Sequence, residues 1–137
     1  MDNEHKTRTL AHQLVEILSV YAASLALWRL APSDVALYER THANLDLVRV
    51  LGGKAFPGHR DVTADLLAAH TELKLQLLRR HMGRLHLHGA PDGGDAEMQL
   101  QGLVERHEDT VAALRALCLQ SCGPEATGAS RLAVLHG

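Results

Sequence analysis

Apolar residues recur at spacings of three and four along most of the chain, and this pattern constrains the fold more than any other feature. The longest such stretch runs from His59 to His88 and carries half of the ten histidines. Its apolar positions and His70 fall on one stripe, which predicts a single long helix. Because such a helix must bury its apolar stripe, we expect the rest of the chain to supply partner helices.

Turn signals divide the chain into four such segments. Pro32, the Gly52–Gly53 pair, the GAPDGG run at 89–94 and Gly123-Pro124 each interrupt the pattern. Ser33 or Asp34 is expected to cap the second helix, Gly52–Gly53 to end it, and Asp95 to cap the fourth. The sequence therefore predicts helices at about 7–31, 33–51, 60–88 and 95–121, with residues 1–6 frayed.

Short connections between these segments predict one all-α domain over residues 1–137, a four-helix up-and-down bundle. Residues 123–137 are expected to form a short C-terminal tail or helix. Aromatic residues make up only 3% of the chain, so the core must consist mainly of leucine, alanine and valine. This composition is typical of packing between helices, and the arginine, alanine and leucine bias suggests a bacterial source.

Charge and hydropathy indicate which partners to expect. The formal net charge of −2 with neutral histidines argues against a nucleic-acid partner. The polar start of the chain and the short apolar run at 17–28 predict a cytoplasmic protein without a membrane partner. The second half of helix 7–31 is apolar nearly all round, which predicts a homodimer or larger homo-oligomer formed through helix 7–31.

Three histidines are the candidate metal ligands: His42, His70 and His107. They lie on the expected core stripes, and His42 and His70 are expected at one level of the bundle with Tyr21 nearby. Equal distance from the 89–94 turn places His107 about 9 Å further along the axis. Zn, Ni, Fe or haem is the possible cofactor; the alternative is core histidines hydrogen-bonded to a neighbour such as Tyr21 or Thr71.

Two further metal hypotheses have less support from the sequence. Cys118 and Cys122 lie one helical turn apart and could bind a soft metal as thiolates, or pack as small hydrophobic groups. Glu39 and His42 have the Glu-x-x-His spacing of ferritin-like di-iron proteins. The full di-iron ligand set is not met, because no second Glu-x-x-His follows.

Other histidine patterns suggest different functions. The segment His70-Thr71-Glu72-Leu73-Lys74 resembles the phosphorylated segment of histidine phosphotransfer bundles, and His107-Glu108 resembles a kinase dimerisation helix. His59, His70 and His81 recur every eleven residues, but successive rings are too far apart for one metal site. The basic, histidine-rich stretch 79–88 is either a surface for an acidic protein partner or a solvated helix end.

The sequence favours a non-enzymatic interaction or regulatory protein that forms homo-oligomers. It contains no nucleophile elbow, phosphate loop or HExxH motif, although an enzyme whose site is assembled across helices stays open. A transition-metal- or haem-binding bundle is the first alternative, and a histidine phosphotransfer module is the second.

Overall fold

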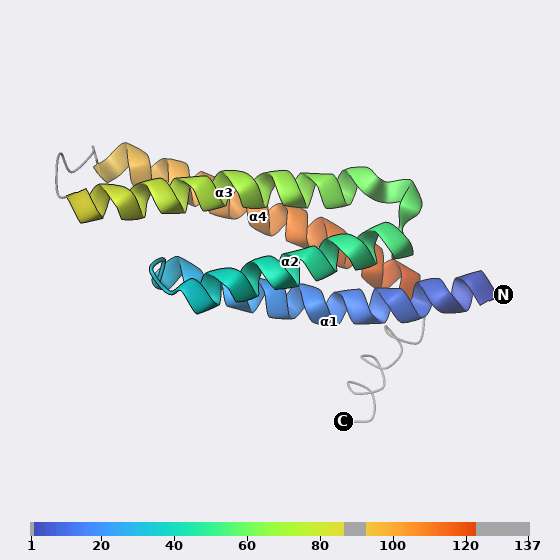
Figure 1. Cartoon of the computed structure of the whole chain (residues 1–137). Helices are drawn as coiled ribbons and strands as arrows, with labels where there is room; N and C mark the ends of the chain where they lie inside the picture. Colours follow the sequence, from blue (N-terminus) through green and yellow to red (C-terminus); the bar gives the residue numbers. More distant parts are fainter. Residues whose placement is uncertain (1, 87–92, 123–137) are drawn as a thin grey trace, which may run out of the picture.

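The computed structural model describes residues 2–86 and 93–122, and every regular element in them is helical (Figure 1). In chain order the elements are α1 (Asp2–Leu30), α2 (Val35–Ala55), the 3-10 turn η1 (Pro57–His59), α3 (Arg60–His86) and α4 (Gly93–Cys122). This confirms the all-α, four-helix prediction. The expected tail or helix of residues 123–137 lies outside the described residues, as does the predicted end of the third helix at 87–88.

The four helices form two antiparallel hairpins that face each other. Figure 1 shows α1 beside α2 and α3 beside α4, with α4 passing diagonally behind the other three helices. α1 packs against both α2 and α4, whereas α2 and α3 approach each other mainly near the η1 turn. The far end of the α3–α4 hairpin extends past the α1–α2 turn.

Several helix boundaries differ from the prediction. α1 already begins at Asp2, so residues 2–6 are helical and the expected frayed start at 1–6 is wrong for them. α4 begins at Gly93, which places Asp95 inside the first turn and not at the cap. Asp34 is the cap of α2, and its carboxylate accepts a hydrogen bond from the Leu37 N–H at 3.1 Å.

The Gly52–Gly53 pair lies inside α2, and the prediction that it ends the helix is wrong. The helix continues to Ala55, and the Phe56 N–H still donates to the Gly52 carbonyl at 2.9 Å. A Cβ atom at position 52 would lie 3.0 Å from Oγ1 of Thr63 on α3. Gly52 therefore lets α2 and α3 approach closely without displacing Thr63, and the helix ends because Pro57 follows.

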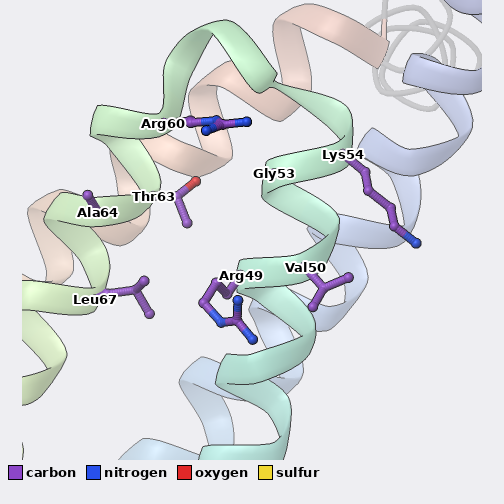
Figure 2. Close-up of a pocket in the computed structure, with 8 residues that line it drawn as sticks. All are labelled: Arg49, Val50, Gly53, Lys54, Arg60, Thr63, Ala64 and Leu67. Atoms are coloured by element: carbon purple, nitrogen blue, oxygen red, sulfur yellow. The ribbon is translucent and has the colours of Figure 1, made fainter.

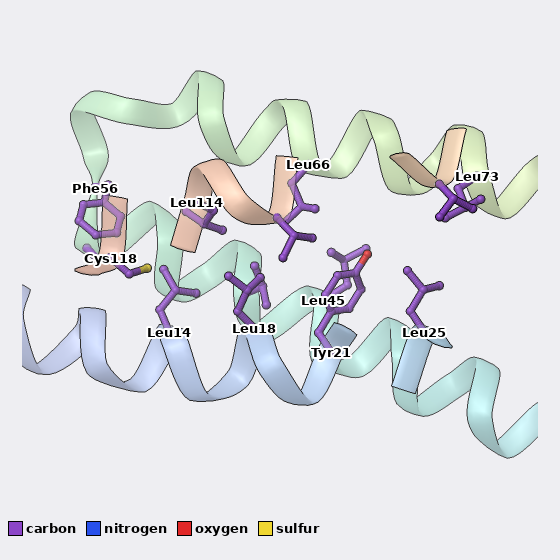
Figure 3. Close-up of a cluster of buried hydrophobic side chains, with 14 of the residues drawn as sticks. Leu14, Leu18, Tyr21, Leu25, Leu45, Phe56, Leu66, Leu73, Leu114 and Cys118 are labelled. Atoms are coloured by element: carbon purple, nitrogen blue, oxygen red, sulfur yellow. The ribbon is translucent and has the colours of Figure 1, made fainter. Parts of the chain in front are cut away.

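The core is a continuous layer of aliphatic side chains between the two hairpins (Figure 3). α1 contributes Leu14, Leu18 and Leu25, and α3 contributes Leu66 and Leu73, all of which are less than 5% exposed. Burying one such leucine stabilises the fold by about 1.5–3 kcal/mol. The remaining buried apolar residues are Ala11, Tyr21, Trp28, Leu45, Val48, Ala55, Phe56, Ala69, Leu77, Leu100, Val104, Val111, Leu114, Cys118 and Cys122.

The two glycines of α2 give a matched test of helix packing. A Cβ atom at Gly53 meets nothing within 4 Å, so Gly53→Ala should raise the free energy of unfolding by about 0.5–1 kcal/mol. Gly52→Ala should raise the free energy of unfolding by less than Gly53→Ala does, or should lower it, because Thr63 must move. In a Thr63→Ala background the two substitutions should become equivalent, as measured by urea denaturation. Equal effects of the two glycine substitutions in the parent chain would contradict the close α2–α3 approach.

Candidate functional site

One polar side chain from each helix meets in the middle of the apolar core. Tyr21 of α1 is fully buried, His70 of α3 is 1% exposed and His107 of α4 is 4% exposed. His42 of α2 is half-buried beside them. In Figure 3 the Tyr21 side chain extends from α1 toward the centre of the bundle. We call these four residues the Tyr–His cluster.

The Tyr21 hydroxyl joins two of the histidines. Its Oη lies 2.7 Å from Nδ1 of His70 and 2.6 Å from Nε2 of His107. A hydroxyl carries one proton, so it donates to one ring and accepts an N–H from the other, and both rings are neutral in this arrangement. The expected hydrogen bond of a core histidine to Tyr21 is therefore present for both rings, whereas Thr71 donates instead to the Leu67 carbonyl.

His107 lies at the level of His70, and the prediction that it sits about 9 Å further along the axis is wrong. The two ring centroids are 6.3 Å apart. The ion pairs of Arg80 with Glu97 and of Arg106 with Glu72 show which residues of α3 and α4 lie level. Residues that pair across the α3–α4 hairpin are equidistant from about residue 89, whereas the prediction assumed the midpoint of the 89–94 turn. Relative to the prediction, α4 is therefore displaced along α3 by about one and a half helical turns.

His42 is held from within its own helix. Its Nδ1 lies 2.9 Å from the backbone carbonyl of Tyr38, and its ring stacks on the Tyr38 ring with centroids 4.2 Å apart. A carbonyl oxygen only accepts, so Nδ1 carries the proton, and the Nε2 of the neutral ring is a free lone pair. The His42 and His70 rings are 5.2 Å apart, nearly perpendicular at 82°, so the expected shared level is observed.

Two ring nitrogens of the cluster have no hydrogen-bond partner in the described part of the chain. They are Nε2 of His42 and Nε2 of His70, and both atoms are buried. Nearly all buried polar atoms in folded proteins are paired, so an unpartnered pair on neighbouring rings requires a physical reason.

Burial dominates the electrostatics of the cluster. It lowers the pKa of His70 to about 3, with smaller contributions from the charges of His42, His107 and Lys74. Burial also lowers the pKa of His107 to about 4, with a contribution from Arg29. Burial raises the pKa of Tyr21 above its usual value. All three groups are therefore uncharged near neutral pH.

The cysteines of α4 are free and buried in the core, away from the Tyr–His cluster in sequence. Burial and the neighbouring Cys122 raise the pKa of Cys118 to about 12, and burial raises the pKa of Cys122. Protonated thiols are poor metal ligands, so burial favours the alternative in which both cysteines pack as small hydrophobic groups. Figure 3 shows Cys118 on the same side of the core as Phe56 and Leu14.

The described residues contain no group of three or more histidine, cysteine, aspartate or glutamate side chains placed to hold a metal ion. Among the eleven-residue series, His59 lies exposed in η1, His81 is half-buried near the end of α3, and only His70 is in the core. In the basic stretch 79–88, Arg80 pairs with Glu97 of α4, and residues 87 and 88 lie outside the described part.

A pocket of about 410 Å³ lies between α2 and α3, next to the η1 turn (Figure 2). Arg49, Lys54 and Arg60 bring positive charge to it, and Leu67 contributes apolar surface. In Figure 2 the Lys54 side chain points away from α3, so the three cations do not converge. The sequence does not predict this pocket, because the Gly52–Gly53 pair has the composition of a helix end and not of a helix segment packed on α3.

A second groove of about 270 Å³ runs between α1 and α4 and is bordered by His107. Arg29, Glu108 and Arg115 line it with both signs of charge. His107, whose ring bonds to Tyr21, thus borders a groove at the surface. No family model matches the chain, and comparison with curated proteins and with solved structures found no match.

Removing the Tyr21 hydroxyl tests its bridging role. Tyr21→Phe should lower the free energy of unfolding by about 1–3 kcal/mol for each histidine nitrogen left unpartnered. The Tyr38 side chain makes no hydrogen bond in the described residues and is half-buried, so Tyr38→Phe is the matched control. Denaturant unfolding of the two variants should separate them clearly. A loss for Tyr21→Phe no larger than that for Tyr38→Phe would show that the hydroxyl does not bridge the rings.

The stability of the fold should depend on pH through His70 and His107. Both have a folded-state pKa below the ordinary 6.5, so the unfolded chain takes up protons first as the pH falls. Stability is therefore full above pH 6.5 and declines as the pH falls toward 4 to 3, by up to about 1.4 kcal/mol per pH unit for each ring. Urea denaturation between pH 7 and 5 measures this slope.

The slope should decrease in His107→Gln, whose amide still reaches Tyr21 but does not titrate. His59→Gln, at an exposed position, should keep the parent slope. Parallel pH dependences for the parent chain and both variants would assign the acid sensitivity to other groups.

Proposed function

We propose that this protein is a non-enzymatic helical interaction module that associates with a second copy of itself through the outer face of α1. The observation that carries this proposal is a row of exposed apolar residues on the side of α1 opposite the core. Val20 is 49% exposed, Leu27 is 54% exposed and Leu30 is 85% exposed.

The spacing of this row suits helix-on-helix packing. Glu16, Val20, Ala23, Leu27 and Leu30 are all exposed and follow one another at alternating steps of four and three. This is the seven-residue repeat of a two-helix seam, in which side chains of one helix fit between those of another. We call these five residues the outer seam of α1.

The neighbouring helix widens the outer seam. The Asn44 side chain donates to Ser24 at 3.3 Å, which sets the register of α2 against α1. In this register Leu47 of α2 lies level with Val20, and Leu47 is 46% exposed. Adjacent helices thus expose two large aliphatic side chains at one level of the bundle, which favours a continuous apolar surface over single scattered residues.

A second copy fits this surface because the outer seam can pair with itself. In an antiparallel pairing of two α1 helices, Val20 lies opposite Leu27 of the second copy, with Ala23 at the close-contact centre. Such a two-fold arrangement is the commonest symmetry of small oligomers.

A bilayer is the competing occupant of α1. By length and composition alone, Glu4–Leu30 could cross a membrane, with a mean hydropathy of 1.4 over an 18-residue stretch of it. The expectation of no membrane partner therefore stays a prediction. By length and composition a buried helix of a bundle has the same properties, and one face of α1 is already occupied by the core residues.

Phosphotransfer and an acidic protein partner receive less support than self-association. Phosphotransfer requires an accessible histidine nitrogen, whereas His70 and His107 are buried and bonded to Tyr21. An acidic partner at the basic stretch 79–88 would compete with Glu97 for Arg80. Three further expectations stay predictions: that the protein is cytoplasmic, that it is bacterial and that it does not bind nucleic acid.

Sedimentation velocity at high micromolar concentration tests the self-association. The parent chain should sediment as a dimer of the 14.9 kDa chain. Leu27→Glu should weaken the dimer at least tenfold, because it buries a charge in the outer seam, with a loss of stability within about 0.5 kcal/mol. The control is Leu75→Glu on the outward side of α3, where Leu75 is 47% exposed, and it should remain dimeric.

A parent chain that stays monomeric at this concentration would overturn the proposal. So would equal behaviour of the Leu27 and Leu75 variants. Co-sedimentation of the monomer with anionic vesicles, lost in Leu27→Glu, would assign the outer seam to a membrane surface instead.

A further inference from the structure

We propose that Nε2 of His42 and Nε2 of His70 bind one transition-metal ion of the kind that prefers imidazole, such as Zn²⁺, Ni²⁺ or Cu²⁺, with water completing its coordination. This site is independent of the self-association through α1. It uses two of the three histidines expected as ligands, since the Nε2 of His107 is occupied by Tyr21.

A pair of unpartnered, buried nitrogens marks the site. Nε2 of His70 is buried on a ring that is 1% exposed, and Nε2 of His42 is buried on the ring beside it. Within the described residues nothing donates to either atom. An electrophile shared by both nitrogens would satisfy them together.

The positions of the ring protons also suit a metal ion. The Tyr38 carbonyl fixes the proton of His42 on Nδ1, which leaves Nε2 as a lone pair. For His70 two arrangements are available through Tyr21. If Nδ1 accepts from the hydroxyl, Nε2 must carry a buried proton with no acceptor, and orphaned buried N–H groups are rare.

In the second arrangement, Nδ1–H of His70 donates to Tyr21 and the hydroxyl donates to Nε2 of His107. Both unpartnered Nε2 atoms are then lone pairs, which is the form in which a neutral histidine binds a metal. The same hydrogen bonds hold the ring orientations. Metal-binding histidines commonly donate their second N–H to a carbonyl or similar acceptor in this way.

The spacing of the two rings fits a single ion. Metal–nitrogen bonds of about 2.0–2.1 Å at a tetrahedral ion place two imidazole centroids about 5 Å apart. The His42 and His70 centroids are 5.2 Å apart. The backbone therefore already holds the two rings at a separation suited to one ion.

The surroundings make this an open, exchangeable site and not a structural one. The described residues supply no third ligand, so water must fill the other positions. His42 is half-buried and gives access from its side of the bundle. Lys74, one turn after His70, lies close enough for its charge to act on His70, and it would repel a bound cation as well.

Zn²⁺ titration of the full chain without a histidine tag tests the proposal. The midpoint of thermal unfolding should rise with Zn²⁺ concentration, as mass action requires for a folded-state site. The Nε2 resonances of His42 and His70 should shift with one equivalent in nitrogen-15 spectra. His42→Gln should abolish both effects, whereas His59→Gln, at an exposed histidine, should preserve them.

Lys74→Gln should strengthen Zn²⁺ binding several-fold, because it removes the nearby positive charge. A general affinity of surface histidines for Zn²⁺ would not respond to that change. The proposal is overturned if the resonances of the two Nε2 atoms do not move, which would leave a buried water as their partner, or if the shifts persist in His42→Gln. Binding retained in Leu27→Glu would show that the metal site stands apart from the dimer.

Discussion

The Tyr21 hydroxyl, held between His70 and His107, is the interaction on which the arrangement of the helices depends. Three helices each place a polar group in the same layer of an otherwise aliphatic core, and α2 adds His42 beside them. Leucine packing alone tolerates many small shifts of one helix along another, because the hydrophobic effect does not depend on the direction of a contact. A hydroxyl with one proton and two ring partners does not tolerate them, because a shift leaves buried nitrogens unpartnered. We infer that this polar layer specifies the register of the bundle.

The same layer accounts for the division of α1 into two faces. The inner face carries Tyr21 and the leucines of the core, and its polar atoms are satisfied within the chain. The outer face carries Val20, Leu27 and Leu30 without covering side chains in the described residues. A bundle built this way has no need of the outer apolar residues for its own fold, which is why we assign them to association. The neutral histidines couple the fold to acid, since protonating a buried ring is costly.

Helix number, type and most core positions followed from the sequence, because the three-and-four spacing of leucines needs no knowledge of tertiary contacts. Boundaries were less accurate. Gly52 and Gly53 have the composition of a helix end, yet both lie in α2, and Gly52 packs closely against Thr63 of α3. Only the packing of α2 against α3 distinguishes these two uses of glycine.

The site was partly predictable for the same reason. His42, His70 and Tyr21 meet as expected, since short turns fix which residues lie level. His107 was misplaced, because a small error in the centre of the α3–α4 connection doubles along α4. That Tyr21 bonds two rings at once required the coordinates of three helices.

Nitrogen-15 spectra of the histidine rings across a titration from pH 8 to pH 5 test the central interaction most directly. His70 and His107 should stay neutral throughout, each with a single ring proton and one nitrogen shifted by its bond to Tyr21. The same rings in the urea-unfolded chain should titrate near the ordinary value of about 6.5, which provides the reference. If either ring becomes a charged imidazolium above pH 5 in the folded protein, Tyr21 does not bridge two neutral histidines.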